Sequence, residues 1–70
     1  MTFRLKELRE ARHMTQVRLG VELDLSQDVI SRYETHDREA DYQTLLDIAD
    51  FFGVSLDYIF GRTDNPEINK

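Results

Sequence analysis

Apolar residues recur every three or four positions along most of this 70-residue chain, in segments separated by short polar stretches. This spacing places the apolar side chains on one face of an α-helix. No segment alternates apolar and polar residues for long enough to indicate a β-strand. The pattern therefore predicts an all-α fold, and the segments are consistent with five helices.

The second and third predicted helices follow each other closely within the segment TQVRLGVELDLSQDVISRYE. Thr15 is the expected N-cap of the second helix, whose buried side carries Leu19 and Leu23. Ser26 is the expected N-cap of the third helix. Gly20 lies inside the second helix, where glycine is less stable than alanine by ~1 kcal/mol. We therefore expect the third helix to pack closely against Gly20.

The third helix is predicted to extend to about Thr35, and its two faces differ in polarity. Val29, Ile30 and Tyr33 form the face that we expect to be buried. The opposite face is polar, and we expect it to be exposed. It consists of Gln27, Asp28, Ser31 and Arg32.

A first helix is predicted from about Thr2 to Arg12, with Leu5 and Leu8 on its buried face. A polar loop at residues 35–40 leads to a fourth helix, which Asp41 can cap. The buried stripe of the fourth helix consists of Leu45, Ile48, Ala49 and Phe52.

Residues that end helices divide the C-terminal part of the chain. Gly53 is the expected left-handed C-cap of the fourth helix. Ser55 can cap a short fifth helix from Leu56 to Phe60, and Gly61 ends that helix. These signals place both ends of the last two helices from the sequence alone.

The composition restricts the possible functions. We expect residues 1–62 to form one domain and residues 63–70 to form a frayed tail. The chain has no cysteine, and His13 and His36 lack a third ligand, so we expect no disulfide and no metal site. Nothing resembles a phosphate loop or an activated nucleophile, so we expect no enzyme activity, no cofactor and no small-molecule ligand. The absence of a signal sequence and of a long apolar run predicts a cytoplasmic protein without membrane contact.

The formal net charge of −5 argues against nucleic-acid binding, but the charges are unevenly distributed. Residues 1–38 carry seven basic and seven acidic side chains, whereas residues 39–70 carry two basic and seven acidic ones. A phosphate backbone would therefore be accepted by the first half of the chain and repelled by the second half.

Two separated blocks of residues carry a resemblance to a known family. The blocks are Thr15-Gln16, Leu19, Leu23, Leu25-Ser26 and Ile30 to Glu34, followed by Phe52 to Tyr58. At this spacing the chain resembles the phage-repressor and Cro-like helix-turn-helix family, also called the xenobiotic-response-element group, from about Phe3 to Asp64. The resemblance implies a five-helix, lambda-repressor-like DNA-binding domain, usually dimeric and mostly a transcriptional repressor.

The resemblance also implies roles for individual residues. The third helix, at about residues 26–35, enters the major groove in this family. The implied base contacts are Gln27, Asp28 and Arg32. The implied contacts with the DNA backbone are Gln16, Arg18, Ser31 and Arg38. Arg9 and Glu34 match a salt bridge that ties the first helix to the end of the third.

The residues themselves leave some of these roles open. Arg32 can bind guanine or a phosphate, or it can pair with Asp28 one turn earlier. Asp28 can accept a hydrogen bond from cytosine, complement the helix N-terminus, or hold Arg32 in position. Arg9 and Glu34 can form a plain surface pair or a partly buried pair that orients the third helix, and we favour the second.

The chain departs from the family pattern at three helix ends, where glycine is common. We expect His13, Asp24 and His36 to adopt the positive φ that those positions require. The loop from His36 to Ala40 is also less basic than is usual in the family, so we expect fewer phosphate contacts from it.

On these grounds we expect the partner to be a pseudopalindromic double-stranded operator, bound by a homodimer. The alternative function is a protein-interaction module of the same fold, an antitoxin-like or anti-repressor partner with little DNA affinity. Apolar side chains outside the main stripes indicate either ordinary partial burial or a dimer face. They are Leu46, Phe51, Tyr58 and Ile59.

Overall fold

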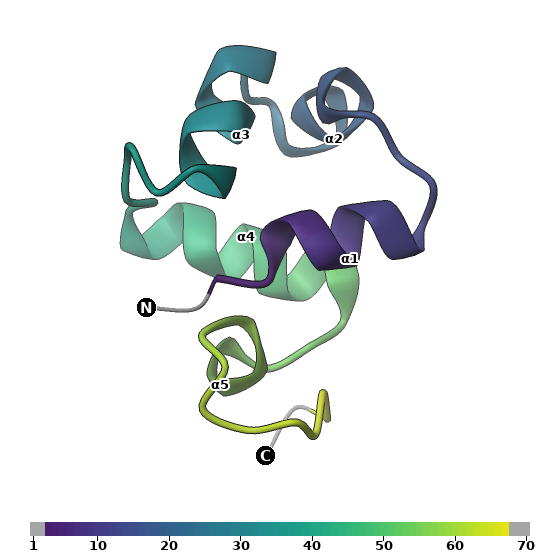
Figure 1. The fold of residues 1–70 in the computed structure, drawn as a ribbon, viewed down its shortest axis with the longest axis vertical. Helices are drawn as coiled ribbons and strands as arrows, with labels where there is room; N and C mark the ends of the chain where they lie inside the picture. The colour runs from purple at the N-terminus through teal and green to yellow at the C-terminus, as the bar shows by residue number, and fades with distance from the viewer. Residues whose placement is uncertain (1–2, 68–70) are drawn as a thin grey trace.

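The computed structural model describes residues 3–67, and these residues form helices and no strands (Figure 1). The helices are α1 (Leu5–Ala11), α2 (Gln16–Leu23), α3 (Gln27–Glu34), α4 (Tyr42–Phe52) and α5 (Leu56–Ile59). The pair α2 and α3 lies at one end of the molecule, α5 lies at the other, and α1 and α4 lie between them (Figure 1). The prediction of an all-α, five-helix fold is confirmed. Within these residues no helix is both long and apolar enough to cross a membrane.

Four helices begin where a side chain caps them, as the sequence predicts. In each case the capping oxygen accepts a hydrogen bond from the backbone N–H three residues later, at 2.9–3.2 Å. The caps are Thr15, Ser26, Asp41 and Ser55. These starts are therefore determined by local sequence.

The start of α1 differs from the prediction. Arg4 occupies the cap position without a side-chain cap bond, and its backbone N–H donates to the Ile59 carbonyl at 2.9 Å. Since this contact comes from α5, tertiary structure decides where α1 begins. Thr2, where the helix was predicted to start, lies outside the described residues.

The three non-glycine residues predicted to have positive φ all have it. The φ angles are 56° at His13, 57° at Asp24 and 65° at His36. Gly53, at 66°, ends α4 as predicted. The turn after α2 is further closed by Leu25, whose N–H donates to the Gly20 carbonyl at 2.7 Å.

Gly20 has a close neighbour, as predicted, but the neighbour is not the one expected. A Cβ atom at Gly20 would lie 2.5 Å from the carbonyl oxygen of Leu25. The backbone of the turn between α2 and α3 therefore approaches the glycine, rather than α3 itself. A side chain there would displace the turn that sets the start of α3.

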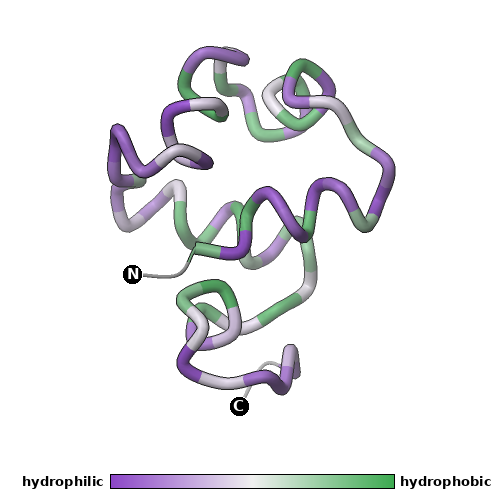
Figure 2. The backbone as a smooth tube through the Cα atoms, viewed as in Figure 1, coloured by the Kyte–Doolittle hydropathy of each residue, from purple (hydrophilic) through white to green (hydrophobic). Residues whose placement is uncertain are grey.

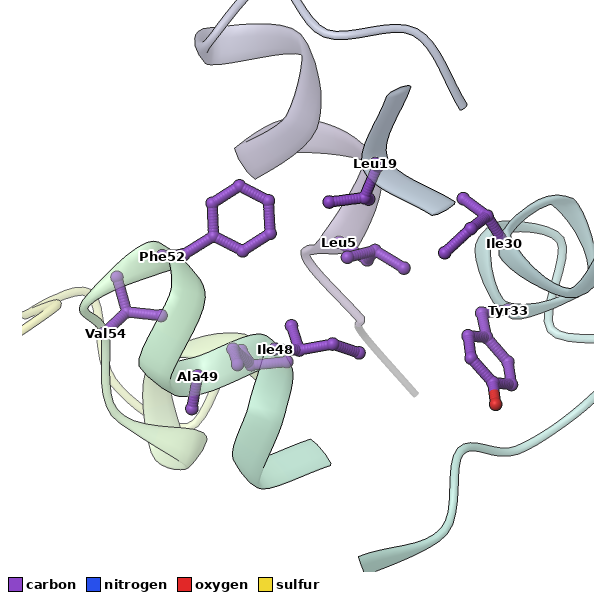
Figure 3. Close-up of a cluster of buried hydrophobic side chains, with 9 residues drawn as sticks. Leu5, Leu19, Ile30, Tyr33, Ile48, Ala49, Phe52 and Val54 are labelled. Carbon is purple, nitrogen blue, oxygen red and sulfur yellow. The ribbon is translucent and has the colours of Figure 1, made fainter. Parts of the chain in front are cut away.

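The hydrophobic core is formed by apolar side chains from one side of each helix (Figure 3). Green apolar and purple polar positions alternate along the helices, and purple predominates in the loop after α3 (Figure 2). The buried side chains are Leu5, Leu19, Ile30, Tyr33, Ile48, Ala49, Phe52, Val54 and Ile59. Ile59 is 0% exposed. Its assignment to a dimer face is therefore wrong, because α5 turns this side chain toward α1 and the core.

The prediction of a frayed C-terminal tail is also wrong for the part that the structure describes. The Asp64 carboxylate accepts a hydrogen bond from the Arg4 guanidinium at 2.9 Å. The Ser55 N–H donates to the Pro66 carbonyl at 3.1 Å. These contacts join the tail to α1 and α5 through residues far away in the sequence, so helical periodicity could not reveal them. Residues 68–70 of the predicted tail lie outside the described residues.

Candidate nucleic-acid interface

The outer face of α3 presents polar side chains to solvent. Gln27, Asp28 and Arg32 are exposed, and Ser31 is half-buried. The inward residues Ile30 and Tyr33 are held in the core, which fixes the rotation of the helix about its axis. The hydrophobic periodicity therefore determines which side chains α3 offers to a partner.

A chain of side-chain hydrogen bonds links the first residues of α2 and α3. Gln27 Nε2 donates to Gln16 Oε1 at 3.0 Å. Gln16 Nε2 in turn donates to Glu34 Oε1, at the last residue of α3, at 3.2 Å. Gln16 thus holds the amide of Gln27 at the exposed start of α3, and Glu34 in turn holds Gln16.

This chain ends on a buried ion pair between Arg9 and Glu34. Arg9 Nε and Nη2 donate to the two carboxylate oxygens of Glu34 at 2.8 and 3.0 Å. The two side chains are 12% and 3% exposed, respectively. Arg9 Nη1 also donates to the Met14 carbonyl at 2.8 Å. The hydrogen bond with Glu34 raises the pKa of Arg9 above its usual value, although burial opposes this. The pair lies between α1 and the end of α3, as expected for a pair that orients α3.

Asp28 and Arg32 form a second pair on the outer face of α3. Arg32 Nε donates to Asp28 Oδ2 at 2.9 Å, and the side chains are 53% and 72% exposed for Arg32 and Asp28. This hydrogen bond raises the pKa of Arg32 above its usual value. Within residues 3–67 only Nε of the Arg32 guanidinium is hydrogen-bonded, so both Nη groups can donate to acceptors outside this part of the chain.

The residues predicted to contact the DNA backbone surround α3. Gln16 begins α2, where backbone N–H groups favour an anion. Arg18, on the same helix, pairs with Glu22 at 2.7 Å, so a phosphate would compete with this carboxylate. Arg38 lies in the exposed loop after α3, and its N–H donates to the Arg32 carbonyl at 3.3 Å. This bond ties the position of the loop to the end of α3.

This geometry agrees with comparisons with known proteins. Residues 5–59 match the model of the Helix-turn-helix family. The chain belongs to the helix-turn-helix family of Cro and C1-type regulators. No solved structure matches it significantly.

Curated relatives of this helix-turn-helix domain come from Bacillus subtilis (strain 168). The chain is 33% identical to the uncharacterized HTH-type transcriptional regulator YqaE over 91% of its length and 55% of the relative's. It is 33% identical to the HTH-type transcriptional regulator ImmR, over 96% of its length and 53% of the relative's. The domain therefore spans a little over half the length of these relatives.

Five exposed acidic side chains of the helix-turn-helix domain lie on α4, on α5 and in the C-terminal segment, whereas Asp28 and Glu34 lie on α3 itself. Asp47 and Asp50 are exposed on α4, Asp57 on α5, and Asp64 and Glu67 in the C-terminal segment. The last two elements are at the end of the molecule opposite α2 and α3 (Figure 1). The acidic residues after residue 38 are therefore only partly remote from α3, because Asp47 and Asp50 line a hollow together with Glu22 and Asp24 at the end of α2.

The remaining members of the predicted dimer face are only half-buried. Leu46 is on α4, and Phe51 packs edge-to-face against Phe52 with 5.0 Å between ring centroids. The Arg12 guanidinium covers Phe51 at 5.2 Å. The Arg4 guanidinium covers Tyr58 at 4.5 Å from the ring centroid. The apolar surface at these positions is therefore smaller than the sequence indicates.

Sequence analysis missed the connections made by three side chains. It treated Gln16 only as a phosphate contact, whereas its amide bridges Gln27 and Glu34. It did not reveal that the Arg12 guanidinium, just after α1, donates to the Phe51 and Phe52 carbonyls at 3.2 Å. It also missed the ion pair of Arg4. The only sequence feature that pointed to any of these contacts was that Gln16 and Gln27 are each the first residue of a capped helix.

Proposed function

We propose that this domain binds double-stranded DNA sequence-specifically, inserts α3 into the major groove, and represses transcription by covering a promoter. The main support is the hydrogen-bond chain from Gln27 through Gln16 to Glu34 and Arg9. A side chain that is already fixed loses little conformational entropy when it binds a base. The buried pair at the end of this chain supplies that fixed position.

Two kinds of base recognition follow from the outer face of α3. The Gln27 amide can donate to and accept from adenine N6 and N7. The free Nη groups of Arg32 can donate to guanine O6 and N7, while Asp28 holds Nε. We assign Asp28 this positioning role, because its carboxylate is already engaged and would be repelled by phosphate. Backbone contacts would come from Gln16, Ser31, Arg18 and Arg38, and from the free N–H groups at the start of α2.

The protein-interaction alternative is less well supported. The curated relatives are named transcriptional regulators, and the polar face of α3 is free in the monomer. An antitoxin-like or anti-repressor module would require neither a fixed Gln27 nor an exposed Arg32.

A selection of bound duplexes from a random pool, followed by affinity measurements at several salt concentrations, tests the proposal. Gln27→Ala and Arg32→Ala should each weaken binding to the selected site by ~1–3 kcal/mol and change random-DNA binding little. Gln43→Ala is the matched control, because Gln43 is an exposed glutamine on α4 that bonds only to Asp47. Equal losses on selected and random DNA would show that Gln27 and Arg32 do not read bases.

Asp28→Ala separates the positioning role from direct base contact. If Asp28 only holds Arg32, the variant should lose discrimination at the base pair read by Arg32 and at no other. The double variant Asp28→Ala, Arg32→Ala should then be no worse than Arg32→Ala alone. A separate loss at a neighbouring base pair would instead assign Asp28 to cytosine.

We further propose that two copies bind a pseudopalindromic site, with half-sites ~34 Å apart. The dimer interface would contain Leu46 and Phe51 of α4 and Tyr58 of α5, and α5 is at the end of the molecule opposite α2 and α3 (Figure 1). Sedimentation of the domain with and without the selected duplex tests this. Leu46→Asp should weaken binding to the full site while leaving half-site affinity unchanged.

A further inference from the structure

A groove of about 450 Å³ lies beside the loop between α3 and α4. Its apolar walls come from four separate parts of the chain: the segment before α1, the loop, α4 and the residue after α5. They are Phe3, Ala40, Leu45 and Phe60. Phe3 and Phe60 contact each other with 5.9 Å between ring centroids. The volume is within the range of small-molecule sites, ~300–1,000 Å³.

Tyr33 supplies a polar group at the floor of this groove. Its side chain is only 4% exposed, and it lines the groove as well as the core. Within residues 3–67 its hydroxyl has no hydrogen-bond partner. The oxygen points away from the neighbouring core side chains (Figure 3). The hydroxyl is therefore an unused donor at the surface of the groove, and a ligand with an acceptor oxygen can bond to it.

The rim of the groove carries charges. Arg38 lines it and forms no salt bridge among the residues that the structure describes. His36 and Glu39 also line it, and both are exposed. Arg38 and the Tyr33 hydroxyl are two donors that a carboxylate can accept from together, whereas Glu39 would oppose an anion.

We propose that this groove binds a small organic anion with an apolar body, such as a medium-chain carboxylate. The apolar body lies between Phe3, Leu45 and Phe60, and the carboxylate accepts hydrogen bonds from Tyr33 and Arg38. The site was invisible in the sequence, because its residues are distributed over nearly the whole chain and none forms a motif.

Occupancy of the groove should also lower DNA affinity, a consequence that rests on the proposed function. Arg38 is a proposed phosphate contact, and its loop is bonded to the end of α3 through the Arg32 carbonyl. A carboxylate paired with Arg38 removes that cation from the DNA backbone. The anion would then act as an inducer of a repressor.

The test is a titration of the ¹⁵N-labelled domain with sodium octanoate in the absence of DNA, so that it does not depend on DNA binding. Saturable shifts are expected at the amides of Tyr33, Ala40, Leu45 and Phe60. Octylammonium, with the same chain and the opposite charge, should bind at least about tenfold more weakly, because it offers no acceptor to Tyr33 and is repelled by Arg38. Equal affinity for the two probes, or shifts that do not saturate, would overturn the proposal.

Variants of the polar lining residues should raise or lower octanoate affinity in a way that a purely apolar groove would not produce. Tyr33→Phe and Arg38→Gln should each weaken octanoate binding about five- to tenfold. Glu39→Gln should tighten it, and Arg62→Gln should not change it, because the Arg62 side chain is 78% exposed and does not line the groove. Unchanged binding in Tyr33→Phe and Arg38→Gln would overturn the site. So would a concentration-dependent dimer that blocks octanoate, because a second copy would then be the occupant.

A last measurement separates this inference from the proposed function. Octanoate should lower the affinity of the wild-type domain for its selected duplex, and it should do so much less in Arg38→Gln. If octanoate binds but DNA affinity is unchanged, the coupling through Arg38 is wrong and the site stands. If no duplex is selected at all, the proposed function fails, while the octanoate titration still decides the site.

Discussion

Replacing Arg9 by methionine removes the cation from the buried pair that anchors α3. Methionine keeps much of the length of the side chain but leaves the Glu34 carboxylate, 3% exposed, without its ionic partner. Breaking a buried pair from one side costs about 3–5 kcal/mol. Because Gln16 still donates to Glu34 and Arg9 is not fully buried, we expect the lower end, about 3 kcal/mol.

Thermal and urea unfolding followed by circular dichroism measure this effect. For a domain of this size, about 3 kcal/mol corresponds to a decrease in Tm of roughly 12–24 °C. The matched control is Arg18→Met, which breaks an exposed pair with Glu22 and should cost less than about 1 kcal/mol. Since so small a domain has a stability of only about 3–5 kcal/mol, Glu34→Gln provides a milder second variant.

The double variant Arg9→Met, Glu34→Met tests the physical reason. With both charges removed, no unpaired carboxylate remains in the interior, and we expect at least half of the lost stability to return. A loss in Arg9→Met as small as that in Arg18→Met would refute the reasoning, because the pair would then behave as if it were exposed. A double variant less stable than Arg9→Met would refute it as well.

Three further predictions concern packing and capping. Gly20→Ala should destabilise the domain by about 1–2 kcal/mol, because overpacking against the Leu25 carbonyl exceeds the gain in helix propensity. The control Gly53→Asn, at a position with free space and positive φ, should cost less. Equal urea-unfolding midpoints for the two variants would contradict the close contact at Gly20. Arg12→Ala should lower stability by about 1–2 kcal/mol, since the guanidinium bonds to the last carbonyls of α4 and stacks on the rings of Phe51 and Phe52. In thermal unfolding, Arg12→Lys should recover part of this stability. Full recovery would show that only the charge matters. Hydrogen bonds from Thr44 lower the pKa of Asp41, so the contribution of this carboxylate to folding stability is present above the unfolded pKa of ~3.9 and is lost as pH falls through the folded value. The Tm of Asp41→Asn should therefore fall less between neutral and acidic pH than the Tm of the wild type. An identical fall would exclude this carboxyl as a source of acid sensitivity.

Local sequence determined where α2, α3, α4 and α5 begin. Capping side chains such as Thr15 and Ser26 form bonds with N–H groups three residues away, so their effect depends on no distant part of the chain. The positive φ at Asp24 likewise follows from its position directly after a helix. The outer face of α3 was predictable for the same reason, because helical periodicity assigns Arg32 and Ile30 to opposite sides.

Tertiary structure decided what depends on residues far apart in the chain. The hydrogen bond between Arg4 and Asp64 joins residues at the two ends of the domain. The composition of residues 63–70 contains no sign of this contact, and for that reason the segment was predicted to be frayed. Ile59 has the same apolar character as a dimer contact, and only packing shows that it is buried. The groove beside the α3–α4 loop depends on four segments at once.

The segment from Thr15 to Glu34 shows both contributions. Its own sequence produced two capped helices, a tight turn and an outward polar face, because each of these is set by neighbours within one or two helical turns. The fixed position of Gln27 was decided elsewhere, by an arginine on α1 that holds a carboxylate at the end of α3. A hydrogen-bond chain of that kind depends on distances across the fold, which the order of residues along a helix does not specify.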